Sequence, residues 1–252
     1  MTDSTSEFAA VGELLARNSR FPPEKLAREE SDAITISNKS RPFKEWLKEF
    51  GVPSRSLECN FLGYDVIDGQ EHARKALKVA QDLANELCSL GKRDIRPRIF
   101  VGLPGTGKTH LACAAIAVAL RAGKVSRYIK AAEIARNVRS SYGRKDSPSE
   151  EMILDRLVRV PFLVIDEIGL GLGSAHEIAM IHDTISERYE EMRPTLLISN
   201  LNKTELLDFL GDRIVDRFRE DNAQIVEFPW TSRRVAIQKE KIAATPQNGE
   251  KA

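Results

Sequence analysis

The residues with the clearest chemical meaning are consecutive positions, from Gly102 to Thr109, that complete the pattern G-x-x-x-x-G-K-[ST]. They lie between an apolar run at 99–101 and a helix-like stretch at 111–122. Glycines let backbone N–H groups turn inward around a polyphosphate, and the helix directs its positive N-terminal end at the same anion. The pattern predicts a nucleotide site in which Lys108 contacts the β- and γ-phosphates of ATP and Thr109 ligates Mg²⁺. The alternative is a chance glycine-rich turn, which the strand-to-helix context disfavours.

A second run, from Phe162 to Glu167, reads as a buried strand that ends in two adjacent carboxylates. In a phosphate-loop fold, Asp166 would hold Mg²⁺ through a water molecule, and Glu167 would polarise the attacking water. Strands also often end at polar turn residues, which is the competing interpretation of this run. Together with the loop, the two acids favour an enzyme that hydrolyses ATP to ADP and phosphate.

The composition limits the classes of protein to consider. The chain has 252 residues, 42% of them hydrophobic, which suffices for one α/β domain and a smaller appendage. Lys and Arg number 38 and Asp and Glu 37, so the net charge argues neither for nor against a nucleic-acid partner. Three widely spaced cysteines, no long apolar stretch and no signal-like start predict a soluble cytoplasmic protein without a membrane partner. The spacing of His176 and His182 does not match H-E-x-x-H, so no zinc site is expected.

Residues 1–60 differ from the rest of the chain, because they are polar and interrupted by proline-containing stretches. We interpret them as a small helical module. Apolar residues follow helical spacing at 8–15, and again at Phe43, Trp46, Leu47 and Phe50. These faces allow two interpretations, a docking surface for a partner protein or the module's own small core.

From residue 61 to about 240, helix-like and strand-like segments alternate, which is typical of a parallel sheet covered on both faces. We expect five strands, at 99–101, 126–129, 162–167, 195–199 and 224–228. Helices are expected at 70–90, 111–122, 131–142 and 176–192, after Ser147, and in short pieces through Leu210 and Phe218. Ser147 would be an N-cap, followed by Pro148 at the first helical position and Glu150 in a capping box. Too few residues follow the last strand for a helical lid domain, and 241–252 read as a disordered tail.

Five motifs, taken in order, resemble those of the DnaC-type bacterial helicase loaders, with the IstB transposition ATPases as close relatives. They are Gly102–Ala112, Leu163–Gly169, Arg193–Asn200, Gly211–Arg217 and Trp230–Arg234, and the similarity spans roughly residues 61–234. The resemblance implies an AAA+ ATPase with a phosphate-loop core, a five-stranded parallel sheet and little or no lid domain. Nucleotide contacts are then expected from Gly102, Pro104, Gly105, Thr106, Gly107, Lys108, Thr109 and His110.

The same resemblance implies further site residues. Asn200 matches the sensor I position, where a polar side chain orients water near the γ-phosphate; otherwise it is a turn asparagine. Arg217 matches the arginine finger and Arg234 the sensor II arginine, because a guanidinium can neutralise phosphoryl oxygens. Arg213 is a second candidate for the finger, and a solvated helix face is the competing interpretation. Since a finger acts on a neighbouring subunit's nucleotide, the resemblance implies self-assembly through nucleotide-bridged interfaces.

Basic and aromatic residues between the second and third strands suggest a contact with single-stranded DNA. Arg139 and Lys145 would follow phosphates and Tyr142 would stack on a base, in a region where the family has an aromatic single-strand contact. A charged surface helix is the alternative. We therefore expect an ATP-dependent loader that binds the replicative DNA helicase and delivers it onto single-stranded DNA. The alternatives are a transposition helper of the IstB type and a non-hydrolysing, nucleotide-gated adaptor.

Overall fold

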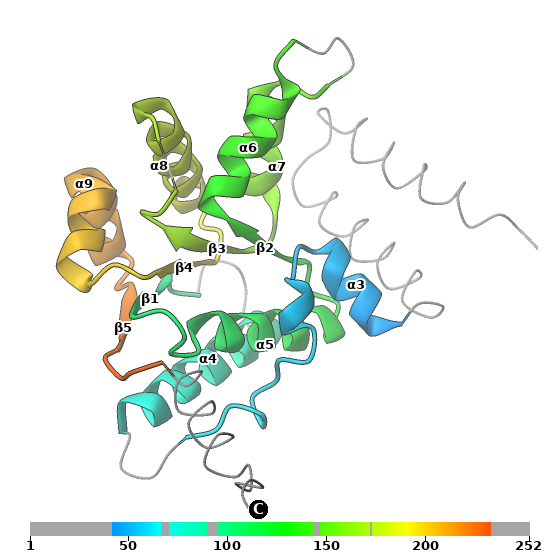
Figure 1. The fold of residues 1–252 in the computed structure, drawn as a ribbon, viewed down its shortest axis with the longest axis vertical. Helices are drawn as coiled ribbons and strands as arrows, with labels where there is room; N and C mark the ends of the chain where they lie inside the picture. The colour runs from blue at the N-terminus through cyan, green and yellow to red at the C-terminus, as the bar shows by residue number, and fades with distance from the viewer. Residues whose placement is uncertain (1–41, 67–70, 90–94, 144–146, 172, 233–252) are drawn as a thin grey trace, which may run out of the picture.

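The computed structural model describes residues 42–66, 71–89, 95–143, 147–171 and 173–232. Its centre is a five-stranded parallel sheet with the strand order β2-β3-β4-β1-β5 (Figure 1). The strands are β1 (Arg98–Gly102), β2 (Ser126–Lys130), β3 (Phe162–Ile168), β4 (Thr195–Ser199) and β5 (Gln224–Phe228). The predicted α/β fold with five parallel strands is confirmed.

Helices cover both faces of the sheet (Figure 1). One face packs against α4 (Glu71–Ser89) and α5 (Lys108–Arg121), and the other against α6 (Ala131–Ser141), α7 (Glu150–Arg159), α8 (Ala175–Glu190) and α9 (Lys203–Glu220). Successive side chains of a strand point to opposite faces of the sheet. Phe100 accordingly packs in the cluster on the α4–α5 face, whereas Ile99 and Val101 pack in the cluster on the other face. None of the described helices is long and apolar enough to cross a membrane.

Helix α7 differs in its start from the prediction. Helix α7 begins at Glu150, because Ser149 is its N-cap and the Ser149 side chain accepts a hydrogen bond from the Met152 N–H at 3.2 Å. The predicted capping role of Ser147 is therefore wrong. The short helices expected through 210 and 218 are present as the two parts of α9, which meet at a kink at Gly211, where φ is 73° and ψ is 161°.

The helix predicted around Trp46 is present, and it packs against the central domain of the same chain. Helix α3 (Phe43–Glu49) and the 3-10 turn η1 (Ser54–Ser56) follow one another along the chain, and Trp46 is 6% exposed within the same apolar cluster as α4 and α5. The Tyr128 N–H of β2 donates to the Phe50 carbonyl at 2.9 Å, which ties the segment to the sheet edge. This helix is therefore neither an exposed docking face nor the core of a separate module. Residues 1–41, with the helix expected at 8–15, lie outside the described residues.

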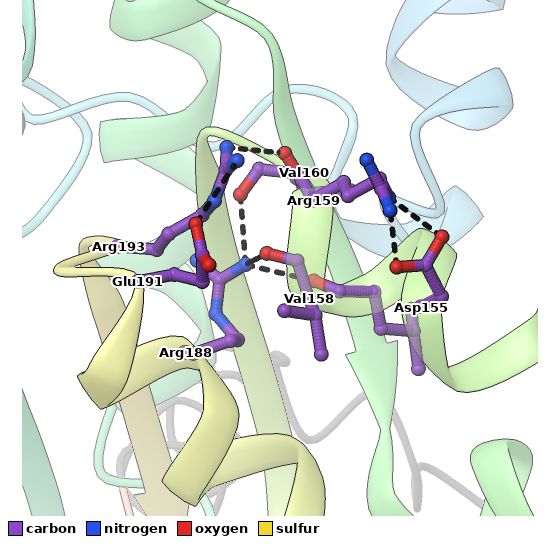
Figure 2. Close-up of polar contacts among 8 residues, drawn as sticks. Asp155, Val158, Arg159, Val160, Arg188, Glu191 and Arg193 are labelled. Atoms are coloured by element: carbon purple, nitrogen blue, oxygen red, sulfur yellow. Dashed lines mark hydrogen bonds and ion pairs between the residues drawn. The ribbon is translucent and has the colours of Figure 1, made fainter. Parts of the chain in front are cut away.

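A buried arginine joins α7, α8 and the start of β4 (Figure 2). Arg188 is 0% exposed, and burial lowers the pKa of its guanidinium. It donates to the carbonyls of Leu157, Val158, Val160 and Pro194, at 2.7, 2.9, 2.7 and 2.6 Å. The cation thus meets the negative C-terminal end of α7, which is a favourable placement. The neighbouring Arg193 donates to the Arg159 carbonyl at 2.6 Å, so the start of the Arg193–Asn200 motif has a structural role.

Candidate nucleotide-binding site

The predicted phosphate loop connects the end of β1 to the start of α5. Gly107, the N-cap of α5, has φ of 99°, in the left-handed region that favours glycine. A Cβ atom at Gly107 would lie 2.6 Å from Cε2 of Tyr64, and one at Gly102 would lie 2.4 Å from the Phe228 carbonyl oxygen. The loop backbone is therefore held closely by a tyrosine on one side and by β5 on the other, which leaves no room for larger side chains.

Lys108 lies inside this loop and is 4% exposed. Its Nζ donates to the carbonyl oxygens of Gly102 and Leu103, at 2.5 and 2.8 Å. Burial lowers the pKa of Lys108 to about 8, although the nearby Asp166 carboxylate opposes that shift. The ammonium group is thus positioned by the loop backbone, at the place where a polyphosphate is expected.

Thr109 and Asp166, the two residues predicted to bind Mg²⁺, contact each other. The Thr109 Oγ1 donates to Asp166 Oδ2 at 2.7 Å, and Asp166 Oδ1 accepts from the Glu167 N–H at 2.7 Å. A hydroxyl and a carboxylate are hard oxygen ligands, so this pair fits Mg²⁺ that is also held by nucleotide phosphates. The described residues contain no group of three or more His, Cys, Asp and Glu that could hold a metal without a nucleotide.

Glu167 lies at the end of β3 in a left-handed conformation, with φ of 59°. Its Oε1 accepts from Nζ of Lys130 at 2.7 Å, and each side chain of the pair is about one-third exposed, at 35% and 32%. Lys130 is the last residue of β2 and pairs with Asp166 in the parallel register. The ion pair holds the Glu167 carboxylate next to the Thr109–Asp166 pair, and no local sequence signal points to it.

Asn200 directly follows β4, and β4 pairs with β3. The carboxyl ends of parallel strands lie at the same edge of a sheet, which is where ligands bind in such folds. Asn200 is therefore at the same edge as Glu167, as its predicted sensor role requires.

Known proteins with this combination of fold and loop identify the family. The protein-family model described as "IstB-like ATP binding protein" matches residues 74–236 of this chain. The chain is 32% identical over 229 residues to the replicative helicase loader DnaC of Buchnera aphidicola subsp. Schizaphis graminum, covering 90% of this chain and 88% of the relative. DnaC of Escherichia coli K12 is 33% identical over 209 residues, or 82% of each chain. The chain belongs to the DnaC-type helicase loaders, within the IstB-like ATP-binding AAA+ family.

Two solved structures agree with the fold. A crystal structure of the DnaC helicase loader has a TM-score of 0.58 at 20% identity, and covers 69% of this chain and 99% of its own. The crystal structure of DnaI has a TM-score of 0.58 at 23% identity, and covers 73% of this chain and 95% of its own. At these identities the likeness supports the AAA+ fold of the domain.

In this DnaC-type chain, the predicted finger Arg217 contacts α8. Its NH2 lies 2.5 Å from Glu190 Oε1, and its NH1 donates to the Ser186 carbonyl at 3.2 Å. The side chain of Arg217 is 18% exposed, whereas that of Arg213, 4.0 Å from the same glutamate, is 76% exposed. Arg217 is thus held against its own chain. Arg234 lies outside the described residues.

The residues predicted to bind DNA are partly engaged with acidic groups of this DnaC-type chain. Tyr142 is 54% exposed, and its hydroxyl donates to Glu150 Oε2 at 2.7 Å. Arg139 pairs with Glu177 at 3.2 Å. Lys145 lies outside the described residues. The ring of Tyr142 is therefore accessible, but the charge of Arg139 is partly compensated.

Aromatic residues around the loop were missed as site residues. The Trp230 Nε1 donates to the Thr106 carbonyl at 3.0 Å, and the Tyr64 ring lies 5.6 Å from the His110 ring. His110 also contacts the Asn60 carbonyl through Nε2, at 2.8 Å. Asn60 and Tyr64 precede the phosphate loop in the chain by about 40 residues, and Trp230 follows it by more than 100. Of these residues, only Trp230 belongs to a motif that the sequence analysis identified, the one at 230–234.

Proposed function

We propose that the chain is a cytoplasmic, ATP-dependent loader, which hydrolyses ATP with Mg²⁺ and delivers the replicative DNA helicase onto single-stranded DNA. The observation that carries this proposal is the joint placement of Lys108, the Thr109–Asp166 pair and Glu167 at one edge of the sheet. Relatives at about one-third identity are named as replicative helicase loaders.

For hydrolysis, Lys108 neutralises charge on the β- and γ-phosphates, and Thr109 with Asp166 holds the metal. Mg²⁺, when bound, neutralises further negative charge on the transferred phosphoryl group. Glu167 orients the attacking water and accepts its proton, and Asn200 aligns that water from the neighbouring strand.

We further propose that Arg217 acts on the nucleotide of a neighbouring subunit, with Arg234 reporting on the nucleotide of its own chain. Because Arg217 is paired with Glu190, it has to exchange that carboxylate for phosphoryl oxygens when subunits assemble. Arg213, which is more exposed, is the alternative finger.

The helicase contact is assigned to residues 1–41, because the apolar helix α3 that follows them is buried in the core. Deletion of 1–41 is expected to leave ATP binding nearly unchanged, since the predicted phosphate and magnesium contacts all lie beyond it. Co-purification with the host's replicative helicase should be lost. Full helicase affinity in the truncated protein would place the docking surface on the ATPase domain instead.

The same co-purification experiment tests the alternative function. If a transposase encoded near this protein co-purified in place of the helicase, the result would favour the transposition helper of the IstB type.

Tyr142 is proposed to stack on a base of single-stranded DNA, with Arg139 and Lys145 near the phosphates. Tyr142→Ala is expected to weaken single-strand affinity by about 1–3 kcal/mol, and Tyr142→Phe should retain most of it because the ring remains. Lys145→Ala should mainly flatten the dependence of affinity on salt. The measurement is fluorescence anisotropy with a labelled oligonucleotide at several salt concentrations. Unchanged affinity in both alanine variants would support the charged-surface interpretation.

A further inference from the structure

A buried tyrosine on β2 reaches the carboxylate proposed to hold magnesium. The hydroxyl of Tyr128 donates to Asp166 Oδ2 at 2.7 Å, and the two residues are 3% and 4% exposed. No function described above uses this hydroxyl. Because the carboxylate and the phenol are both buried, their hydrogen bond forms in surroundings where water does not compete for either group.

The backbone of Tyr128 is fixed on both sides. On one side β2 pairs with β3, with Tyr128 opposite Val164. On the other side the Tyr128 N–H donates to the Phe50 carbonyl at 2.9 Å. Gly51 lies so close that a Cβ atom there would be 2.1 Å from the Tyr128 carbonyl oxygen. The phenol therefore approaches Asp166 from a rigid position, as a group that orients a ligand must.

Asp166 Oδ2 accepts hydrogen bonds from two hydroxyl groups, those of Thr109 and Tyr128. As a metal ligand, Thr109 would use an oxygen lone pair and could keep its hydrogen bond to Asp166. Tyr128 lies on a different element and can continue to donate. Together with the Glu167 N–H on Oδ1, it then defines the rotation of the carboxylate. Groups that hold a metal-binding carboxylate in this way typically contribute about 10- to 100-fold to metal affinity.

We infer that Tyr128 is a positioning residue for a divalent cation, which holds the Asp166 carboxylate in the orientation that binds Mg²⁺ beside the nucleotide. The inference rests on the proposed magnesium-dependent ATP site. It adds a residue that acts through Asp166 and does not itself contact the metal or the phosphates.

The test is Tyr128→Phe in the full-length protein, which removes one oxygen and keeps the ring. Binding of a fluorescent ATP analogue is titrated with Mg²⁺, and again in excess chelator. The Mg²⁺ concentration at half-maximal binding is expected to rise about 10-fold or more. Nucleotide affinity in chelator should remain close to that of the parent, whereas the melting temperature of the nucleotide-free protein should fall modestly, because a buried hydrogen bond to a carboxylate is lost. In an Asp166→Ala background the same change should cause no further shift, because the phenol acts through that carboxylate.

The matched control is Tyr189→Phe, which removes a phenol that donates to Glu220 on the surface at 2.5 Å. An unchanged Mg²⁺ midpoint in Tyr128→Phe, or an equal shift in the control, would overturn the inference. An equal loss of nucleotide affinity in chelator would also overturn it, because the hydroxyl would then support the loop and not the cation. If the parent protein itself binds nucleotide without any dependence on Mg²⁺, the proposed magnesium site fails and the inference fails with it.

Discussion

Glu167→Gln is expected to bind ATP as tightly as the parent protein and to hydrolyse it about 100-fold more slowly, or slower still. Glutamine retains the size of the side chain but cannot accept a proton from water. Lys108→Ala, in contrast, should lose nucleotide binding itself, because Lys108 supplies the buried positive charge inside the phosphate loop. Steady-state phosphate release, with and without single-stranded DNA, and equilibrium binding of a labelled nucleotide separate the two defects.

A matched control is Glu58→Gln, which makes the same chemical change in another lysine–glutamate pair. Glu58 pairs with Lys44 at 2.6 Å on the surface, so its loss should leave phosphate release unchanged. Hydrolysis at the parental rate by Glu167→Gln would contradict the role of Glu167 as the base. A parent protein that binds ATP and releases no phosphate under any of these conditions would favour the non-hydrolysing adaptor.

Trp46→Ala is expected to lower the free energy of unfolding by about 3–5 kcal/mol, because a large buried side chain is removed from the core. The Trp46 ring lies between Phe43 and Phe50, with ring centroids 5.7 Å away in each case. Arg121 of α5 covers Phe43, with its Cζ 4.1 Å from the ring centroid. Loss of the indole therefore leaves a cavity between α3 and the central domain. Urea unfolding followed by circular dichroism measures the change.

The control for this prediction is Leu62→Ala, since Leu62 is 100% exposed. That change should stay within about 0.5 kcal/mol of the parent. If Trp46→Ala kept the parental stability and selectively lost helicase binding, the indole would belong to a docking surface and its place in the core would be contradicted. Truncation at residue 60 removes Trp46 and is expected to destabilise the protein for the same reason.

Much of the fold and the central part of the candidate site could be predicted from the sequence, because both depend on short stretches of consecutive residues. The phosphate loop is a local structure whose glycines, lysine and threonine are adjacent in the chain. The buried strands are continuous apolar runs, and β4 and β5 have the predicted bounds. The start of α7 was misplaced because Ser147 and Ser149 both offer a capping hydroxyl. The choice between them depends on where the chain enters the helix.

The tertiary structure alone decided which residues surround those stretches. Tyr128 and Lys130 are 38 and 37 positions away from Asp166 and Glu167, and they meet because β2 and β3 pair in parallel with Lys130 opposite Asp166. Neither residue carries a local pattern that indicates a partner so distant in the chain. The helical spacing around Trp46 likewise showed that one face is covered without showing what covers it. Hydrophobic burial is non-directional, so an apolar face packs equally well against a partner or against its own domain. Only the arrangement of the whole chain distinguishes the two.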